Sequence, residues 1–284
     1  MKIAVCVKQV PVAAASLMGD TSRGGKSLQR VGIDSMLNPF DAAALEAALQ
    51  LKALYSPQGH ELVQAHTQKQ WHEQVEIDVF TMGPSQAGAV LSQAFALGVD
   101  NGYLVTSPHF AGADVLATAY TLSQALAMQH YDVVICGKQS TDGDTGQVGP
   151  SLAAHLGIPH VHHVDRLLNA SATHLQLCQR TPLIEQSLSV PFPLLLVVNM
   201  AAFPCRVPSL KQKLAARKKT WHSIGLEALA DQDPARYGLA GSATEVERVY
   251  VPRQRDHACE TLTGTNAAIA QQVLDVMQEV VCDA

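Results

Sequence analysis

The chain has 284 residues, 47% of them hydrophobic and 16% charged, and a formal net charge of −5 at pH 7. A chain of this size and composition can bury a full core and is slightly longer than single cores usually grow, which predicts one large domain with a terminal extension. The negative charge provides no basic field for a polyphosphate backbone, so we expect no nucleic-acid partner.

The chain begins with a short apolar run at residues 3–7, which predicts a central strand buried on both faces. Residues 12–37 are rich in glycine and predict a long loop or loose hairpin. Asn38-Pro39-Phe40-Asp41 predicts a helix start, because Asn can accept hydrogen bonds from free backbone N–H groups, Pro tolerates the first turn and Asp suits the positive end of the helix dipole. Residues 56–74 are polar and predict a surface connection.

Alternation of strands and helices continues over residues 77–156. The predicted strands are 77–82, 103–106 and 133–136, and the predicted helices are 86–96, 113–129 and 148–156. Strands that alternate with helices of this length are typical of a parallel sheet covered on both faces. The predicted fold class is therefore α/β, a Rossmann-like doubly wound parallel sheet with a C-terminal arm.

The pattern changes after about residue 165. Residues 175–178 and 187–190 predict paired strands, and residues 194–198 predict a buried strand. The remainder is punctuated by prolines, is basic over residues 211–219 and has helical periodicity over residues 265–282. We divide the chain into a nucleotide-binding α/β domain over residues 1–200 and an arm over residues 201–284 that packs on another chain.

Metal and membrane sites are not indicated. The six cysteines lack the C-x-x-C spacing of a zinc site or a redox dithiol, and no apolar run approaches the ~20 residues that span a bilayer. His160, His162 and His163 could form a metal site with Asp165, or a solvated turn after a helix; we favour the turn. A reduced cytoplasm is the expected location, without a signal sequence.

The most informative segment covers residues 137–150, where an apolar strand runs into a glycine-rich loop and then a helix that begins near Val148. Gly143, Gly146 and Gly149 allow close approaches that a Cβ atom would block, and exposed N–H groups at a helix start attract phosphate oxygens. This anatomy suits the phosphates of an adenine nucleotide or flavin. An ordinary glycine-rich loop explains the composition equally well.

Two carboxylates, Asp142 and Asp144, complicate this interpretation because they would repel phosphates. They could cap backbone groups, contact ribose hydroxyls or bind magnesium, and we favour capping and hydroxyl contacts. The spacing matches neither a Walker loop nor G-x-G-x-x-G, and there is no G-x-S-x-G elbow. We expect no catalytic side chains.

Five motifs, in this order, resemble the β subunit of electron-transfer flavoproteins. They are Val7-Lys8-Gln9-Val10-Pro11, Asn38-Pro39-Phe40-Asp41, Met82-Gly83-Pro84, Ala96-Leu97-Gly98-Val99-Asp100 and residues 137–145. Order and spacing agree over roughly residues 1–159, with thinner matches at 206–219 and 237–242. The resemblance implies a heterodimer with an α subunit that holds most of a redox-active FAD, and a β-subunit pocket that contains AMP or, in bifurcating members, a second FAD.

The resemblance also implies a set of cofactor-binding residues. They are Cys6, Asn38, Pro39, Phe40, Asp41, Met82, Gly137, Lys138, Gln139, Ser140, Thr141, Asp142, Gly143, Asp144, Thr145, Gly146, Gln147 and Val148. Residues 142–150 resemble the D-G-D-T-A-Q-V-G-P pattern of the FAD-binding, bifurcating branch, with Gly146 in place of Ala. Residues 110–118 resemble the ribose- and adenine-side loop of that branch. FAD is favoured over AMP, and the choice stays open.

Leu210 aligns with the leucine that anchors the family's recognition loop on partner dehydrogenases, of acyl-CoA or other type. The alternative is a core leucine followed by a solvated basic helix face. The sequence departs from the family at residues 180–187, where an acidic, glycine-containing hairpin is usual, and at residues 203–206, where Asn-Glu-Pro-Arg is usual. Contacts with the flavin of the α subunit are therefore expected to differ.

The resemblance implies an electron carrier whose cofactor supplies the redox chemistry, and NADH-dependent flavin bifurcation is a subtype of this function. The alternative is an adenine-nucleotide-binding regulatory module similar to universal stress proteins, a homodimer without flavin. The Leu210 region and the long C-terminal tail argue against that alternative.

Overall fold

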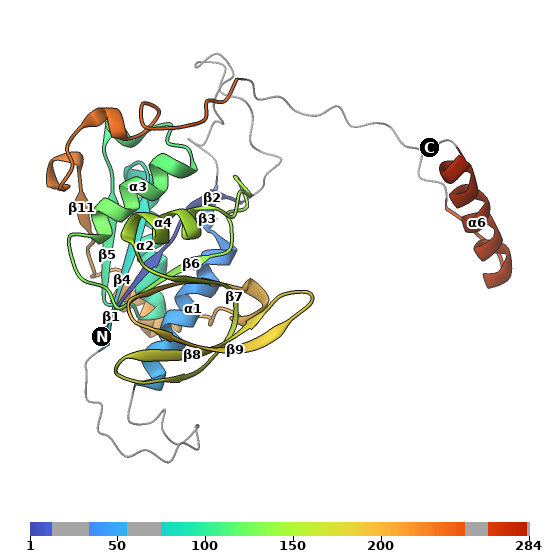
Figure 1. The fold of residues 1–284 in the computed structure, drawn as a ribbon, viewed down its shortest axis with the longest axis horizontal. Helices are drawn as coiled ribbons and strands as arrows, with labels where there is room; N and C mark the ends of the chain where they lie inside the picture. Colours follow the sequence, from blue (N-terminus) through green and yellow to red (C-terminus); the bar gives the residue numbers. More distant parts are fainter. Residues whose placement is uncertain (13–33, 56–74, 248–260, 283–284) are drawn as a thin grey trace. The chain divides into compact units, whose positions relative to one another are not determined.

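The computed structural model describes residues 1–12, 34–55, 75–247 and 261–282 (Figure 1). The chain divides into two compact units, Met1–Val249 and Tyr250–Ala284. Within the described residues, no helix combines the length and apolar character needed to cross a membrane. The predicted surface connection at residues 56–74 lies outside the described residues.

The first unit is built on a nine-stranded sheet with the strand order β11-β5-β4-β1-β6-β10-β7-β8-β9. Its strands are β1 (Lys2–Cys6), β4 (Glu76–Met82), β5 (Asn101–Val105), β6 (Val133–Gly137), β7 (His160–Ala170), β8 (His174–Arg180), β9 (Glu185–Pro191), β10 (Leu194–Val198) and β11 (His222–Ile224). Every pair from β11 to β7 is parallel, and β7, β8 and β9 form an antiparallel meander at one edge. The predicted doubly wound parallel sheet is confirmed, as are the paired strands after residue 165.

Helices cover both faces of the sheet (Figure 1). Helices α1 (Pro39–Leu54) and α2 (Ala89–Leu97) pack on one face, while α3 (Val115–Leu126) and α4 (Val148–Leu156) pack on the other. Because both faces are covered, alternate side chains of β1 enter different cores: Ile3 and Val5 pack with α1, and Ala4 and Cys6 pack on the side of α3 and α4.

Shorter elements complete the described chain. A two-stranded antiparallel sheet joins β2 (Gln9–Pro11) to β3 (Ser35–Leu37), the two ends of the predicted loose hairpin, while residues 13–33 lie outside the described residues. The remaining helices are α5 (Leu210–Ala216) and α6 (Asn266–Cys282), and single 3-10 turns occupy Ser85–Gly88, Pro108–Phe110, Met200–Ala202, Leu226–Ala228 and Pro234–Arg236.

Residues 201–247 belong to the same compact unit as the sheet. β11 pairs with β5, and Leu226, Leu229 and Tyr237 are buried in the core on the α3 and α4 side. The assignment of residues 201–284 to a partner-packing arm stays a prediction.

Two local predictions are wrong. Residues 160–163 form the start of β7 instead of a turn, because they pair with β10. A bulge between Val161 and Val164 accommodates His163 at a φ of 59°. Asn38 does precede α1, but its side chain does not cap the backbone N–H groups of the helix start. It donates instead to the carbonyl of Gln139, 101 residues away in sequence.

Candidate functional site

The candidate site lies where the chain order of the sheet reverses. From β1 the sheet continues through β4 and β5 on one side and through β6 on the other. The carboxyl ends of β1 and β6 therefore lie at a switch point, and open α/β sheets bind ligands in the crevice outside such a point. The start of α1 and residues 138–147 meet at this crevice.

Gly137, the last residue of β6, brings that strand against the start of α1. A Cβ atom at this position would lie 2.6 Å from the backbone carbon of Phe40. No side chain larger than hydrogen fits without moving the backbone. The glycine therefore sets how closely the predicted loop approaches the predicted helix start.

Asp41 joins three segments at the floor of the crevice. Its buried carboxylate accepts a hydrogen bond from the backbone N–H of Lys8 at 2.8 Å and one from the backbone N–H of Gly137. Burial raises the pKa of Asp41 from its ordinary 3.8 to about 7, against hydrogen bonds from Asn38, Lys8 and Gly137 that lower it. The buried carboxyl group thus connects the segments of Lys8 and Gly137 to α1 and presents no exposed charge.

Lys8 and Asn38 hold the loop between β6 and α4. The Nζ of Lys8 lies 2.6 Å from a carboxylate oxygen of Asp142 and donates to the Oγ of Ser140 at 3.2 Å. Asn38 donates its side-chain amide to the carbonyl of Gln139 at 2.8 Å. Asp142 thus pairs with Lys8, so its charge is balanced within the chain.

The loop then turns tightly into α4. Asp144 and Gly146 adopt left-handed φ values of 53° and 64°. The N–H of Asp144 donates to the carbonyl of Ser140 at 2.9 Å, and the side chain of Gln139 donates to the Asp144 carboxylate. Gln147, the N-cap residue of α4, makes no side-chain hydrogen bond to the helix. A helix start without a side-chain cap suits an anion as its hydrogen-bond acceptor.

Neutral side chains border the crevice at the strand ends. Cys6 and Cys136 lie directly opposite each other on β1 and β6 and are buried. A hydrogen bond between the two thiols, together with burial, raises the pKa of the Cys136 thiol. Met82 ends β4 on the same edge. Among residues 1–12, 34–55, 75–247 and 261–282, no group of three or more His, Cys, Asp or Glu is arranged to hold a metal ion.

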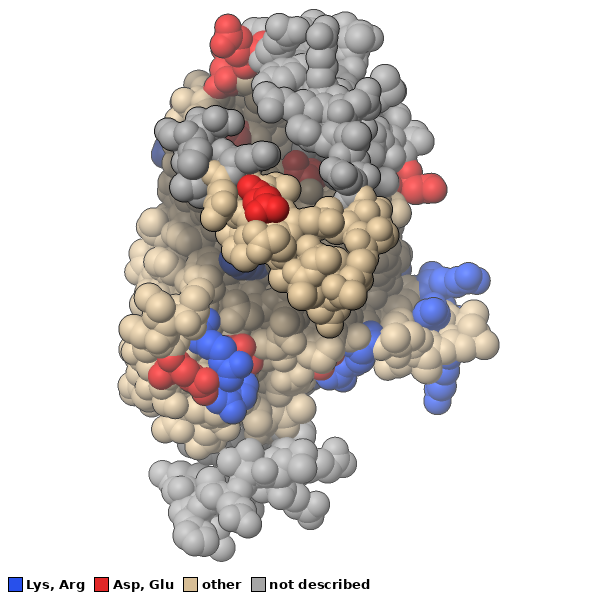
Figure 2. All heavy atoms as spheres, turned by 90° about the vertical axis from the view of Figure 1, so that its right-hand side faces the viewer, with Lys and Arg blue, Asp and Glu red and all other residues tan. Residues whose placement is uncertain are grey.

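Most of the predicted cofactor residues are therefore assembled by the fold, since the ends of β1 and β4, the start of α1 and residues 137–148 share one edge of the sheet. Leu210 lies elsewhere, at the first position of α5, and its side chain is 73% exposed. This exposure contradicts the core-leucine alternative. Residues 201–221 contain six Lys and Arg and no Asp or Glu. On the face drawn in Figure 2, Lys and Arg side chains project from one edge of the molecule.

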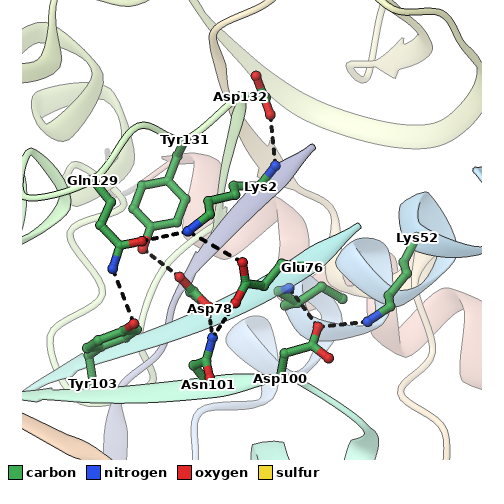
Figure 3. A network of polar contacts seen from close by, with 11 residues as sticks. Lys2, Lys52, Glu76, Asp78, Asp100, Asn101, Tyr103, Gln129, Tyr131 and Asp132 are labelled. Atoms are coloured by element: carbon green, nitrogen blue, oxygen red, sulfur yellow. Dashed lines mark hydrogen bonds and ion pairs between the residues drawn. The ribbon is translucent and has the colours of Figure 1, made fainter. Parts of the chain in front are cut away.

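A separate polar network lies at the amino ends of the strands, opposite the carboxyl ends that border the candidate site (Figure 3). Buried Asp78 accepts hydrogen bonds from the hydroxyl of Tyr131 at 2.7 Å and from the side chain of Asn101 at 2.8 Å. Asn101 also donates to Glu76, which pairs with Lys2. These contacts join β1, β4, β5 and Tyr131, two residues before β6, at the amino ends of the strands and away from the candidate site.

Two carboxylates organise this unit through contacts that sequence reasoning did not foresee. Glu46 of α1 binds the guanidinium group of Arg206. Asp114 caps α3 through the N–H of Ala117 and also accepts hydrogen bonds from the backbone of Ala243 and Thr244. Glu46 had a signal, because it is a lone acidic residue within the alanine-rich run of α1. The hydrogen bonds from Ala243 and Thr244 to Asp114 come from about 130 residues away in sequence, so no local pattern indicates them.

Comparisons with known proteins agree with this geometry. The family model described as "Electron transfer flavoprotein domain" matches residues 59–228. The "Electron transfer flavoprotein subunit beta" of Megasphaera elsdenii is 32% identical over 284 aligned residues, covering 97% of each chain. The protein of the same name from Clostridium acetobutylicum is 36% identical over 251 residues, covering 87% of each chain. "Protein FixA" of Rhizobium meliloti is 33% identical over 279 residues, covering 95% of this chain and 88% of the relative. This chain belongs to the electron transfer flavoprotein family, in the group of its β subunits and FixA proteins.

Proposed function

We propose that this chain is the β subunit of a heterodimeric electron carrier and that residues 137–148 cradle the phosphates of FAD or AMP. The family supports a role in electron transfer and implies a flavin, and its β subunits act with an α subunit. One observation carries the assignment of the site: Gly137, Asp41, Asn38 and Lys8 fix the loop beside the uncapped start of α4, at the strand ends where the order of the sheet reverses.

The residues present fit a phosphate group. Backbone N–H groups at a helix start and in a tight turn are the donors that phosphate oxygens prefer. Thr141, Thr145 and Gln147 add side-chain donors, and Asp142 is already paired with Lys8. When bound, a flavin supplies the redox chemistry, while this chain binds, orients and insulates the nucleotide. The sequence of residues 142–150, which resembles the pattern of the FAD-binding branch, favours FAD over AMP in this pocket.

The proposal extends to the partners. An α subunit that holds the other FAD would pack on residues 201–284, and dehydrogenases of acyl-CoA or other type would dock at Leu210. An exposed leucine within a basic, acid-free segment fits an apolar anchor surrounded by a field that attracts an acidic protein. The carrier would act in the cytoplasm, and NADH-dependent bifurcation is one form that its activity could take.

Nucleotide stoichiometry tests the proposal. The chain is co-expressed with its α subunit, the complex is purified and denatured, and released FAD and AMP are quantified by chromatography. Two FAD per complex, or one FAD and one AMP, is the expected result. One FAD without AMP would refute the pocket, and a flavin-free homodimer would favour the universal-stress-like regulatory module.

A glycine variant links the nucleotide to the crevice. Gly137→Ala places a Cβ atom against the backbone of Phe40 and should remove the second nucleotide while the FAD of the α subunit remains. Gly157→Ala is the control, because it strains a backbone with a φ of 66° by about 1 kcal/mol at a position where the added Cβ meets nothing within 4 Å. Equal nucleotide loss in both variants would mean that general destabilisation, not the crevice, explains the effect.

A further inference from the structure

Glu46 is a buried carboxylate that the candidate site does not use. It lies on α1, is 5% exposed, and is flanked by the buried residues Leu45 and Ala47. Burial of a carboxylate is unfavourable unless the charge is paired and hydrogen-bonded. Its partner therefore identifies what this position contributes to the structure.

That partner is Arg206, 160 residues later in the chain. The guanidinium group binds both carboxylate oxygens, with Nε to Oε2 at 2.7 Å and Nη2 to Oε1 at 2.8 Å. The backbone N–H of Arg206 also lies 3.3 Å from Oε2. Burial raises the pKa of Glu46, but the hydrogen bonds from Arg206 outweigh it and hold the pKa below its ordinary value. A fork of two parallel bonds fixes the direction of the arginine as well as its position.

Arg206 lies at the start of the anchor segment, which we define as residues 206–210. The side chains of Val207 and Leu210 are 87% and 73% exposed. A groove of about 700 Å³ is lined by α1, α2, residues 203–206, Pro208 and part of α5. The core therefore gives the anchor segment little support beyond Arg206.

Helix α5 continues from this segment and is attached again beyond its end. The Nζ of Lys219 donates to the carbonyls of Val99 at 2.8 Å and Asp100 at 3.2 Å. Ser209 and Gln212 form a capping box that begins the helix at Leu210. The direction in which Leu210 points thus depends on the Glu46–Arg206 pair before it, on the packing of α5 against α2 through buried Ala216, and on the Lys219 contacts after it.

We propose that Glu46 is a positioning residue, which through Arg206 fixes the anchor segment so that Leu210 is presented to an electron-transfer partner. The inference rests on the proposed docking role of Leu210. Replacing both partners of a buried ion pair by apolar residues is often neutral or stabilising, so stability alone does not explain the pair of Glu46 and Arg206. Unlike apolar side chains, the two parallel hydrogen bonds of the ion pair also fix the direction of Arg206 and of the segment that follows it.

Hydrogen exchange tests the positioning without any partner. In the purified complex with the α subunit, Glu46→Gln and Glu46→Leu should speed amide exchange in peptides that cover residues 206–212 by about tenfold. Glu76→Gln is the matched control, because it alters a carboxylate in the network at the amino edge of the sheet (Figure 3). Unchanged exchange in both Glu46 variants would overturn the inference.

Electron-transfer kinetics test the consequence. An acyl-CoA dehydrogenase reduced by its acyl-CoA substrate serves as the donor, and flavin content and melting temperature confirm that each variant is folded. Both Glu46 variants should raise the KM for the dehydrogenase about fivefold with kcat unchanged, and Glu46→Leu should add nothing to Leu210→Ala in the double variant. A raised KM for Leu210→Ala with a normal KM for both Glu46 variants would overturn the inference alone. A normal KM for Leu210→Ala would refute the docking role, and the inference with it.

Discussion

The raised pKa of Asp41 predicts that this side chain makes the protein less stable as the pH rises. Its pKa is about 7 in the fold, because burial disfavours the charged form, against an ordinary value of 3.8. The folded state therefore keeps a proton that the unfolded state releases between about pH 4 and pH 7. Stability from this group is fully present below pH 4, falls through that window and is constant above it. The shift of about 3 units corresponds to roughly 4 kcal/mol over the whole window.

The variant Asp41→Asn isolates this effect. Between pH 5 and pH 8, linkage with these two pKa values lowers the stability of the parent by roughly 3 kcal/mol relative to the variant. Urea unfolding of the full-length chain, followed by far-UV circular dichroism at several pH values, gives the two profiles. Asp275→Asn, on the exposed face of α6, controls for the loss of one carboxylate. Parallel profiles for the parent and Asp41→Asn would refute the reasoning, whatever their offset.

Three further substitutions probe the loop, the polar network and the core. Lys8→Met leaves the buried carboxylate of Asp142 without its partner at 2.6 Å, so the loop should become less ordered. The nucleotide Kd, measured by calorimetry, should then rise about tenfold. An unchanged Kd would show that the ion pair does not contribute to nucleotide binding. Tyr131→Phe removes one of the hydrogen bonds to buried Asp78 and should cost about 1–3 kcal/mol in urea unfolding, with nucleotide content unchanged because the network is at the other edge of the sheet. Leu152→Ala leaves a cavity between α4 and the sheet and should cost about 2–5 kcal/mol; a loss below 1 kcal/mol would show that the site collapses freely.

The strands and helices of the sheet could be predicted from sequence because their signals are local. The apolar run of residues 133–136 and the helix after Val148 both appear where expected, within a residue or two. The start of α1 was also located correctly from Asn38-Pro39. The role of Asn38 was wrong, because its side-chain partner, the carbonyl of Gln139, comes from a segment that the local pattern cannot identify.

The histidines of β7 show the same limit more strongly. Residues 160–163 have no strand periodicity, and a turn after the glycine that ends α4 was a reasonable expectation. Pairing with β10 and the hydrogen bond from Gln179 to the carbonyl of His162 make them a strand instead. Long-range pairing therefore overrides a weak local pattern, with His163 in a left-handed conformation.

Two acidic residues of the predicted phosphate cradle, Asp142 and Asp144, count against phosphate binding when only the sequence is considered, and the fold places Asp41 beside the same loop. Each of them has a partner within the chain. Asp41 accepts backbone hydrogen bonds from Lys8 and Gly137, Asp142 pairs with Lys8, and Asp144 accepts from Gln139. A carboxylate bound in this way contributes rigidity more than repulsion, because its charge is balanced or suppressed by burial. The same residues therefore hold the glycine-rich loop in one conformation, and the proposed phosphate cradle depends on that conformation.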